Sequence, residues 1–144
     1  MPYNFFAPKP GRLGVHPNVV SSDMNPTGGT LAAGTKNHNV CASPAKSYIN
    51  RASVCAAVYP TAATSCVATL FKMTGATAVA LTSGLAISAA AADTPLQFVF
   101  LATTTDANRT LNQGDSLRVA LVTTGAVSVQ PDDLAVYVEL LVTE

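Results

Sequence analysis

Apolar and polar residues alternate along the stretch NQGDSLRVALVTTG, residues 112–125. Leu117, Val119 and Leu121 fall on one face of an extended chain, while Arg118 falls on the opposite face. A period of two is typical of a β-strand that is buried on one side. The stretch therefore predicts a strand whose leucines and valine lie in the core, with Arg118 exposed to solvent.

Several other runs share this β-favouring pattern, and Gly, Asn, Asp and Pro residues that favour turns separate them. The predicted strands are Tyr48–Tyr59, Thr64–Met73, Thr77–Leu81, Leu96–Ala102, Leu117–Thr123 and Leu134–Val142, with a weaker one near Asn39. In two of them the apolar face is formed by Leu96, Phe98 and Phe100, and by Leu134, Val136, Val138 and Leu140. Short strands at this spacing predict an all-β fold, an antiparallel, jelly-roll-like β-sandwich over residues 31–144.

One alanine-rich stretch, SAAAADTP, lies between Gly84 and Pro95. It is too short to form a stable helix alone, and Pro95 disfavours helical backbone at Thr94. We expect a loop there, with room for one helical turn.

The first thirty residues differ in composition from the rest, because five prolines stand there among Gly and Asn residues. Proline excludes a helix and disfavours a packed strand, so residues 1–30 are predicted to form an extended arm. Apolar anchors and basic groups on this arm suit docking on a partner. The residues expected to make that contact are Tyr3, Phe5, Phe6, Lys9 and Arg12. The alternative is that the arm packs on its own domain.

Charged residues make up only 11% of the chain, where a soluble domain has about 25%. Eight basic and eight acidic side chains cannot cover the surface of a 144-residue domain, so most of that surface must consist of Thr, Ser, Asn, Gly and Ala. Such a surface is expected where much of it lies against other subunits. We therefore predict a homo-oligomer, a trimer by the resemblance described below.

The two halves of the chain carry opposite charge although the formal net charge is zero. Residues 1–72 hold six basic residues and one acidic residue, and residues 73–144 hold two basic and seven acidic residues. In one interpretation a sandwich mixes both halves and the field cancels. In the other, the basic N-terminal part docks on an acidic surface of a partner.

The cysteines and histidines do not suggest a metal site. Cys41, Cys55 and Cys66 form no C-x-x-C pair and are predicted to be buried and reduced. His38 and Cys41 have H-x-x-C spacing, which supplies only two of the four ligands of a structural zinc site. No metal and no cofactor are expected.

Motifs for catalysis are also missing from the sequence. It contains neither a G-x-S-x-G nucleophile motif nor a G-K-[ST] phosphate loop. Asp115, Asp132 and Asp133 stand at turn signals, where a carboxylate commonly accepts backbone hydrogen bonds. We expect no catalytic residue and no enzymatic activity.

Nucleic acid and membranes are not expected partners either. A neutral chain with scattered cations lacks the basic footprint of a nucleic-acid-binding protein. No apolar run approaches the roughly 18 residues of a membrane span, and no signal peptide is recognised. The expectation is a protein made and used without secretion.

The C-terminal stretch TTTDANRTLNQGDSLRVALVTTGAVSVQPDDLAVYVELLV resembles the small β-sandwich or jelly-roll decoration proteins, also called cement proteins, of tailed-bacteriophage heads. The resemblance runs from about Ala45 to Val142 and includes the hairpin TAATSCVATLFKMTGATAVALT and the segment RTLNQGDSLRV. It implies a non-enzymatic, usually trimeric virion protein, made in the host cytoplasm. Such a protein clamps neighbouring major capsid protein subunits on the outer capsid surface, often with an N-terminal arm.

Two other functions remain open. A receptor- or carbohydrate-binding domain of a head fibre or tail would use exposed aromatic residues, of which this chain has no Trp and four Tyr. A hydrolase on a β-sandwich would need the catalytic constellation that the sequence lacks. Both are therefore less favoured than capsid decoration.

Overall fold

The computed structural model describes residues 15–26, 30–43 and 45–143 of the chain. In these segments the protein is built from twelve β-strands and one helical turn, α1 (Asp106–Arg109). The arm residues Tyr3, Phe5, Phe6, Lys9 and Arg12 lie outside the described segments.

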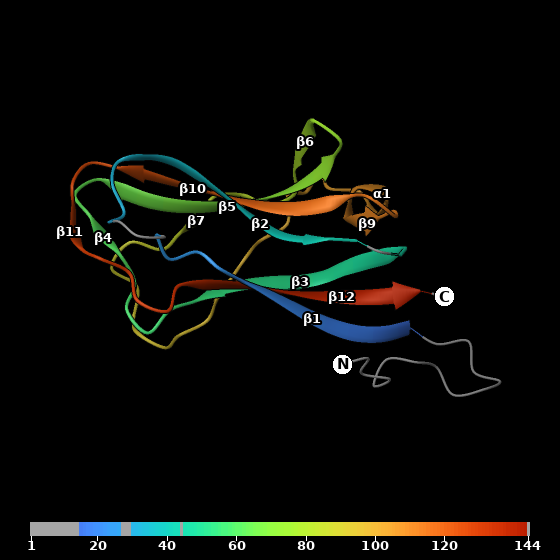
Figure 1. Cartoon of the computed structure of the whole chain (residues 1–144), viewed down its shortest axis with the longest axis horizontal. Coiled ribbons are helices and arrows are strands. Elements are labelled where there is room, and N and C mark those ends of the chain that lie inside the picture. The colour runs from blue at the N-terminus through green and yellow to red at the C-terminus, as the bar shows by residue number, and fades with distance from the viewer. Residues whose placement is uncertain (1–14, 27–29, 44, 144) are drawn as a thin grey trace.

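The strands form two main sheets that pack face to face, with a small third sheet at one end (Figure 1). Sheet A contains, in spatial order, β1 (Val15–Asp23), β12 (Ala135–Thr143), β3 (Ser47–Cys55) and β8 (Leu96–Gln97), with β9 (Thr110–Leu111) also paired to β3. Sheet B contains β2 (Gly34–Ala42), β10 (Ser116–Thr124), β5 (Ser65–Thr74) and β6 (Thr77–Ala80), with β7 (Leu85–Ala86) also paired to β5. The small sheet pairs β4 (Thr61–Ala62) with β11 (Val127–Val129).

The strand order is that of a jelly roll. The long strands alternate between the sheets, with β1, β3 and β12 in sheet A and β2, β5 and β10 in sheet B, and every pairing is antiparallel. Figure 1 shows the first and last strands, blue and red, side by side in the lower sheet. The predicted all-β, antiparallel, jelly-roll-like sandwich is confirmed.

The core lies between the sheets and follows the predicted alternation. Leu117, Val119 and Leu121 of β10 are fully buried, and they face sheet A, where Val136 and Val138 of β12 are also fully buried. The apolar side chains of the two inner faces form one continuous cluster. Burial of this cluster is the main force that holds the sheets together.

The prediction of no packed strand before residue 30 is wrong for Val15–Asp23. This segment forms β1 and pairs with β12 along its whole length. Among the described strands β1 pairs with β12 alone, so one of its sides is an open edge. Proline is tolerated in an edge strand, where one side of the backbone needs no donor, so the proline in this segment does not exclude a strand.

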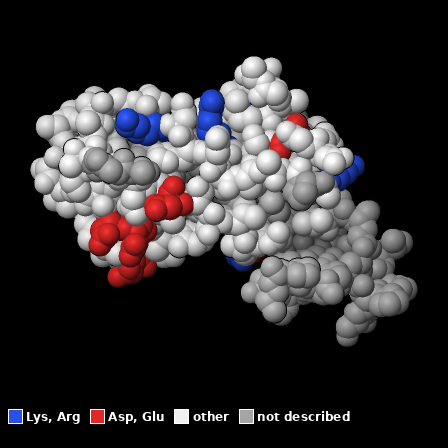
Figure 2. All heavy atoms as spheres, in the orientation of Figure 1, with Lys and Arg blue, Asp and Glu red and all other residues white. Residues whose placement is uncertain are grey.

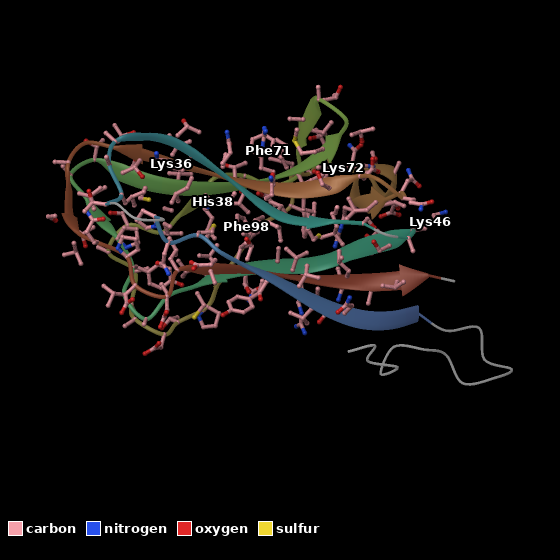
Figure 3. All side chains as sticks on the ribbon, in the orientation of Figure 1. Lys36, His38, Lys46, Phe71, Lys72 and Phe98 are labelled. Atoms are coloured by element: carbon pink, nitrogen blue, oxygen red, sulfur yellow. The ribbon has the colours of Figure 1, made fainter. Side chains whose placement is uncertain are left out.

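The predicted strand Leu96–Ala102 is shorter than expected. Only Leu96–Gln97 is a strand, because the chain then crosses from sheet A to sheet B. The Phe98 amide donates to Ala52 of β3, whereas Phe100 forms a bridge with Thr82 beside sheet B. Phe98 fills the space between the sheets (Figure 3). The crossing closes the edge of the sandwich opposite β1 and β2.

Two short segments outside the long strands are the loop before Pro95 and the helical turn α1. The alanine-rich stretch before Pro95 is a loop with turns, as expected. The helical turn α1 was not predicted; Thr105 caps its N-terminus by accepting a hydrogen bond from the Asn108 amide at 3.3 Å. Four residues are too few for the apolar periodicity that reveals a helix.

Candidate functional site

The outer face of sheet A carries polar side chains in register across its strands. One row joins Gln97 of β8, Ser53 of β3, Tyr137 of β12 and Ser21 of β1. Because neighbouring strands are about 4.8 Å apart, this row spans roughly 14 Å. The next outward row along these strands consists of Arg51, Glu139 and Val19, and the row on the other side consists of Cys55, Ala135 and Asp23. We call this surface face A.

Two hollows lie on face A, and Tyr137 lines both. One, of about 260 Å³, is lined on its polar side by Arg51, Ser53, Gln97 and Glu139. The other, of about 420 Å³, is lined by residues of β1, of the segment after β1, of the turn before β12 and of the first position of β12, namely Ser21, Ser22, Asp23, Asn25, Asp133 and Ala135. Because Tyr137 lines both hollows, it lies between them. The residue is 41% exposed, so it is open to solvent.

An ion pair fixes the charged row of face A. Arg51 donates to Glu139 Oε2 from Nε at 3.1 Å and from Nη2 at 2.8 Å, and Asn50 donates to Oε1. These hydrogen bonds, first from Asn50 and then from Arg51, hold the pKa of Glu139 below its usual range. The Arg51 side chain is 71% exposed and that of Glu139 15%, so the arginine offers further donors to a ligand.

The outer face of sheet B, which we call face B, is nearly free of charge. Its outward residues form rows across β2, β10 and β5, two of which continue onto β7 or β6. The first row is Thr35, Val122, Val67 and Ala86, the second is Asn37, Ala120 and Thr69, and the third is Asn39, Arg118, Phe71 and Ala80. Figure 3 shows Phe71 on the outer side of sheet B. Arg118 is the single charged residue in these rows.

Arg118 lies on the outward face, as predicted, but it is half-buried rather than exposed. Its guanidinium carbon lies 5.9 Å from the centre of the Phe71 ring, and its Nε is buried with no hydrogen-bond partner among the described residues. Neighbouring side chains on a flat sheet cover the stem of a long residue, which the alternation alone does not reveal. The exposed charge on face B is therefore small.

Asp115 has the structural role that its turn position suggests. Its carboxylate accepts hydrogen bonds from the Asn112 amide at 2.9 Å and the Thr74 hydroxyl at 2.8 Å, and its Oδ2 lies 3.3 Å from Lys72 Nζ. Burial alone would raise the pKa of this carboxyl, but the two hydrogen bonds and Lys72 outweigh it and lower the pKa. The sequence did not reveal Lys72 as its partner.

The other acidic candidates lie on the turn that precedes β12. Asp132 and Asp133 are both exposed, and the backbone of Asp132 pairs with that of Val58. Figure 2 shows acidic groups gathered over this end of the sandwich, where β1 also ends. Asp133 and Asp23 line the same hollow, so face A is acidic at this end.

The His38 and Cys41 pair lies on the edge strand β2. His38 lines a hollow of about 380 Å³ together with Met24, Leu31 and Lys36, and its Nε2 is buried without a partner in the described part of the chain. Burial lowers the pKa of His38, Asp23 opposes this effect and Lys36 adds to it. Cys41 is half-buried, and burial raises the pKa of its thiol.

The three cysteines are free thiols. Cys66 is buried as predicted, with its sulfur 3.4 Å from the Thr123 hydroxyl oxygen, whereas Cys41 and Cys55 are half-buried. Residues 15–26, 30–43 and 45–143 contain no group of three or more His, Cys, Asp or Glu side chains that could hold a metal ion. In the same segments no helix is long and apolar enough to cross a membrane.

No motif in the sequence singles out Tyr137 as a functional residue. The alternation in LAVYVELLV already placed it opposite Val136 and Val138, so its outward direction could have been found. Its neighbours Gln97, Ser53 and Ser21 come from three other strands and depend on pairing that a single sequence does not show. Comparison with protein-family models, curated proteins and solved structures finds no match for the chain.

Proposed function

We propose that this protein is a non-enzymatic structural protein of a bacteriophage virion, which decorates and stabilises the capsid by contacting neighbouring major capsid protein subunits. It is made in the host cytoplasm, forms a homotrimer and lies on the outer capsid surface. The observation that carries the proposal is face B, a paired sheet surface with one half-buried charge among its outward rows. Surfaces depleted of charge are typical of the centres of protein interfaces.

Two charged side chains of the described segments, Arg109 and Lys72, bind parts of the fold to each other, which supports a structural role. The Arg109 guanidinium stacks 4.0 Å from the centre of Phe100 and 4.8 Å from that of Tyr48, and it donates to the carbonyls of Ile49 and Asn50. Lys72 pairs with Asp115, and its Nζ also donates to the Thr110 carbonyl at 2.6 Å. Side chains held in this way tie loops to strands at one end of the sandwich.

The pairing between charges also favours one interpretation of the split charge. Lys72 and Arg51 come from the basic half, and their partners Asp115 and Glu139 come from the acidic half. The sandwich therefore mixes the two halves at these places. The basic residues Lys9 and Arg12 remain part of the proposed arm.

The proposed mechanism is additive stabilisation by many weak contacts. A contact worth on the order of a few kcal/mol per subunit suffices, because a protein that binds only the assembled state shifts the equilibrium toward it and linked sites gain avidity. The arm extends the contact. Residues 2–14, which precede β1, span at most about 45 Å when extended, which reaches beyond the edge of a domain of this size.

The oligomeric state gives the first test. Light scattering of the full chain at micromolar concentration should report a trimer. A uniform monomer would contradict the interpretation of the low charge.

A substitution in face B tests the surface itself. Val122→Asp places a charge at an outward position that is 40% exposed, and Val129→Asp does the same at a 42% exposed position on β11, outside both faces. Both variants should melt close to the wild type. Val122→Asp should fail to co-sediment with phage heads assembled without this protein, while Val129→Asp should still bind. Equal binding by the two variants would rule out face B as the docking surface.

A deletion tests the arm separately. Removing Pro2–Gly14 leaves β1 intact and should weaken co-sedimentation while the melting temperature of the free protein changes little. Undiminished binding would exclude a docking role for Tyr3, Phe5, Phe6, Lys9 and Arg12. A large drop in melting temperature would instead show that the arm packs on its own domain.

A further inference from the structure

Face A differs from a protein-docking surface in the kind of groups that it exposes. Tyr137 offers an open ring between two hollows, and the polar groups around it are hydroxyls, two amides, carboxylates and one guanidinium, with Val19 and Pro95 on the apolar side of the smaller hollow. An exposed aromatic ring surrounded by hydrogen-bonding groups suits a ligand with both an apolar face and many hydroxyls. Sugar rings have that combination, since C–H groups line one face and hydroxyls surround the rim.

The hydrogen-bonding groups stand on strands whose backbones are paired, and one of them is also held by an ion pair. Gln97, Ser53 and Ser21 project from paired strands in one row with Tyr137. Arg51 is fixed by two hydrogen bonds to Glu139, and it keeps donors free because most of its side chain is exposed. Groups that are already ordered lose little entropy when they bind a ligand.

The charge on this surface selects among sugars. Arg51 is neutralised by Glu139, and Asp23 and Asp133 line the second hollow, so carboxylates outnumber basic groups around Tyr137. An acidic sugar would be repelled at that end, whereas a neutral sugar would find acceptors for its hydroxyls. A second copy of this chain that docked through its own face A fits less well, because carboxylates of the two copies would be buried against each other.

From this geometry we propose that face A binds a neutral oligosaccharide, with the Tyr137 ring as the stacking platform. Gln97, Ser53 and Arg51 hydrogen-bond the sugar on one side of the ring, and on the other side the carboxylates of Asp23 and Asp133 accept hydrogen bonds from its hydroxyls. The row across β8, β3, β12 and β1 spans roughly 14 Å, long enough for a short oligosaccharide rather than a single sugar. The site does not depend on the capsid role, which rests on face B.

The test is titration of the full chain, followed by amide chemical shifts, with named probes. The neutral probes are cellohexaose, maltohexaose, chitotetraose and mannotetraose; the acidic probes are sialyllactose and trigalacturonate. We expect at least one neutral probe to bind at millimolar concentration or below and to shift amides of β3, β8 and β12. Binding of acidic probes alone, or of no probe, would overturn the proposal.

Variants decide whether Tyr137 is the platform. Tyr137→Ala should weaken binding of the neutral probe at least tenfold, while Tyr137→Phe, which keeps the ring, should stay within about threefold. Gln97→Ala should weaken binding several-fold. Val129→Asp, on β11 outside both faces, is the matched control and should bind the probe as the wild type does. Equal affinity in Tyr137→Ala and the wild type, with both proteins folded, would overturn the proposal.

Discussion

The two sheets of this jelly roll have the same inner faces and different outer faces. Toward the core, both present fully buried aliphatic residues, such as Val119 in sheet B and Val136 in sheet A. Away from the core, face A carries an exposed tyrosine, an ion pair and acidic groups, whereas face B carries alanine, valine, threonine and one half-buried arginine. The residues of the inner faces stabilise the fold. The residues of the outer faces determine which kind of ligand or protein each side of the sandwich can bind.

The strongest test of this comparison places a charge on an inner face. Val119→Asp should lower the free energy of unfolding by about 4 kcal/mol or more, because an ionised carboxylate would lie in the core without a partner. Denaturant unfolding followed by circular dichroism measures the change. A loss below about 1 kcal/mol would mean that Val119 does not face the core.

The second test compares a buried ion pair with one on face A. The side chains of Lys72 and Asp115 are only 12% and 7% exposed, and Asp115 also accepts two hydrogen bonds. Asp115→Ala should cost about 3 kcal/mol, because it leaves a buried ammonium without its carboxylate. The control, Glu139→Gln on face A, should leave the melting temperature nearly unchanged. An equal loss in both variants would contradict the distinction.

The same carboxylate predicts an acid dependence. The pKa of Asp115 is lower in the folded state, so its contribution to stability is complete above the unfolded-state pKa of about 3.9 and is lost as the pH falls through the folded-state pKa. Stability measured between pH 6 and pH 2 should therefore fall more steeply in the wild type than in Asp115→Asn. Parallel curves would show that Asp115 does not carry the effect.

The third test compares a buried tyrosine with the exposed one. The Tyr59 hydroxyl donates to the Val54 carbonyl at 2.9 Å or the Thr94 carbonyl at 2.7 Å, and burial raises its pKa to about 12. Tyr59→Phe should cost about 1–2 kcal/mol in urea unfolding, because it leaves buried acceptors unpaired. Tyr137→Phe should cost far less. Wild-type stability should also fall above pH 10, where the unfolded tyrosine ionises first, and Tyr59→Phe should lose part of that slope.

The smallest effect is expected on face B. Arg118→Ala removes the contact between the guanidinium and the Phe71 ring. The buried Nε of Arg118 makes no hydrogen bond with the described residues, so the substitution should lower the free energy of unfolding by about 1 kcal/mol or less. Thermal melts of Arg118→Ala and Val119→Asp make the comparison within one strand. A larger loss for Arg118→Ala would mean that the inward and outward residues of β10 are exchanged.

The period-two pattern predicted the inner faces well. Leu117, Val119 and Leu121 were expected in the core and are fully buried there. Successive side chains of a strand point to opposite faces of the sheet, so every second residue of β10 faces the core. The pattern failed for β1, where VHPNVVSSD contains a proline and no regular alternation. That strand forms by pairing with β12, and pairing over such a distance leaves no local signal.

The outer faces could be predicted only in part. Alternation gives the direction of Tyr137 and Arg118, but it does not show how much their neighbours cover them. Lys72 and Asp115 lie 43 positions apart and meet because β5 and β10 pair, which is a property of the fold rather than of either segment. Register therefore determines the composition of each face, and register cannot be derived from one sequence.

The pairing of β1 with β12 also constrains how the chain folds during synthesis. Val15 pairs with Thr143 and Asp23 with Ala135, so the first described strand cannot join its sheet until the last one has been made. Until then β12 is missing from the middle of sheet A, between β1 and β3, and the apolar side chains of β3 have no complete sheet around them. Contacts so distant in sequence fold slowly and leave strand edges open to aggregation. Newly made chains should therefore need rapid synthesis of β12, or binding by chaperones, to avoid aggregation, even though the completed sandwich is stable.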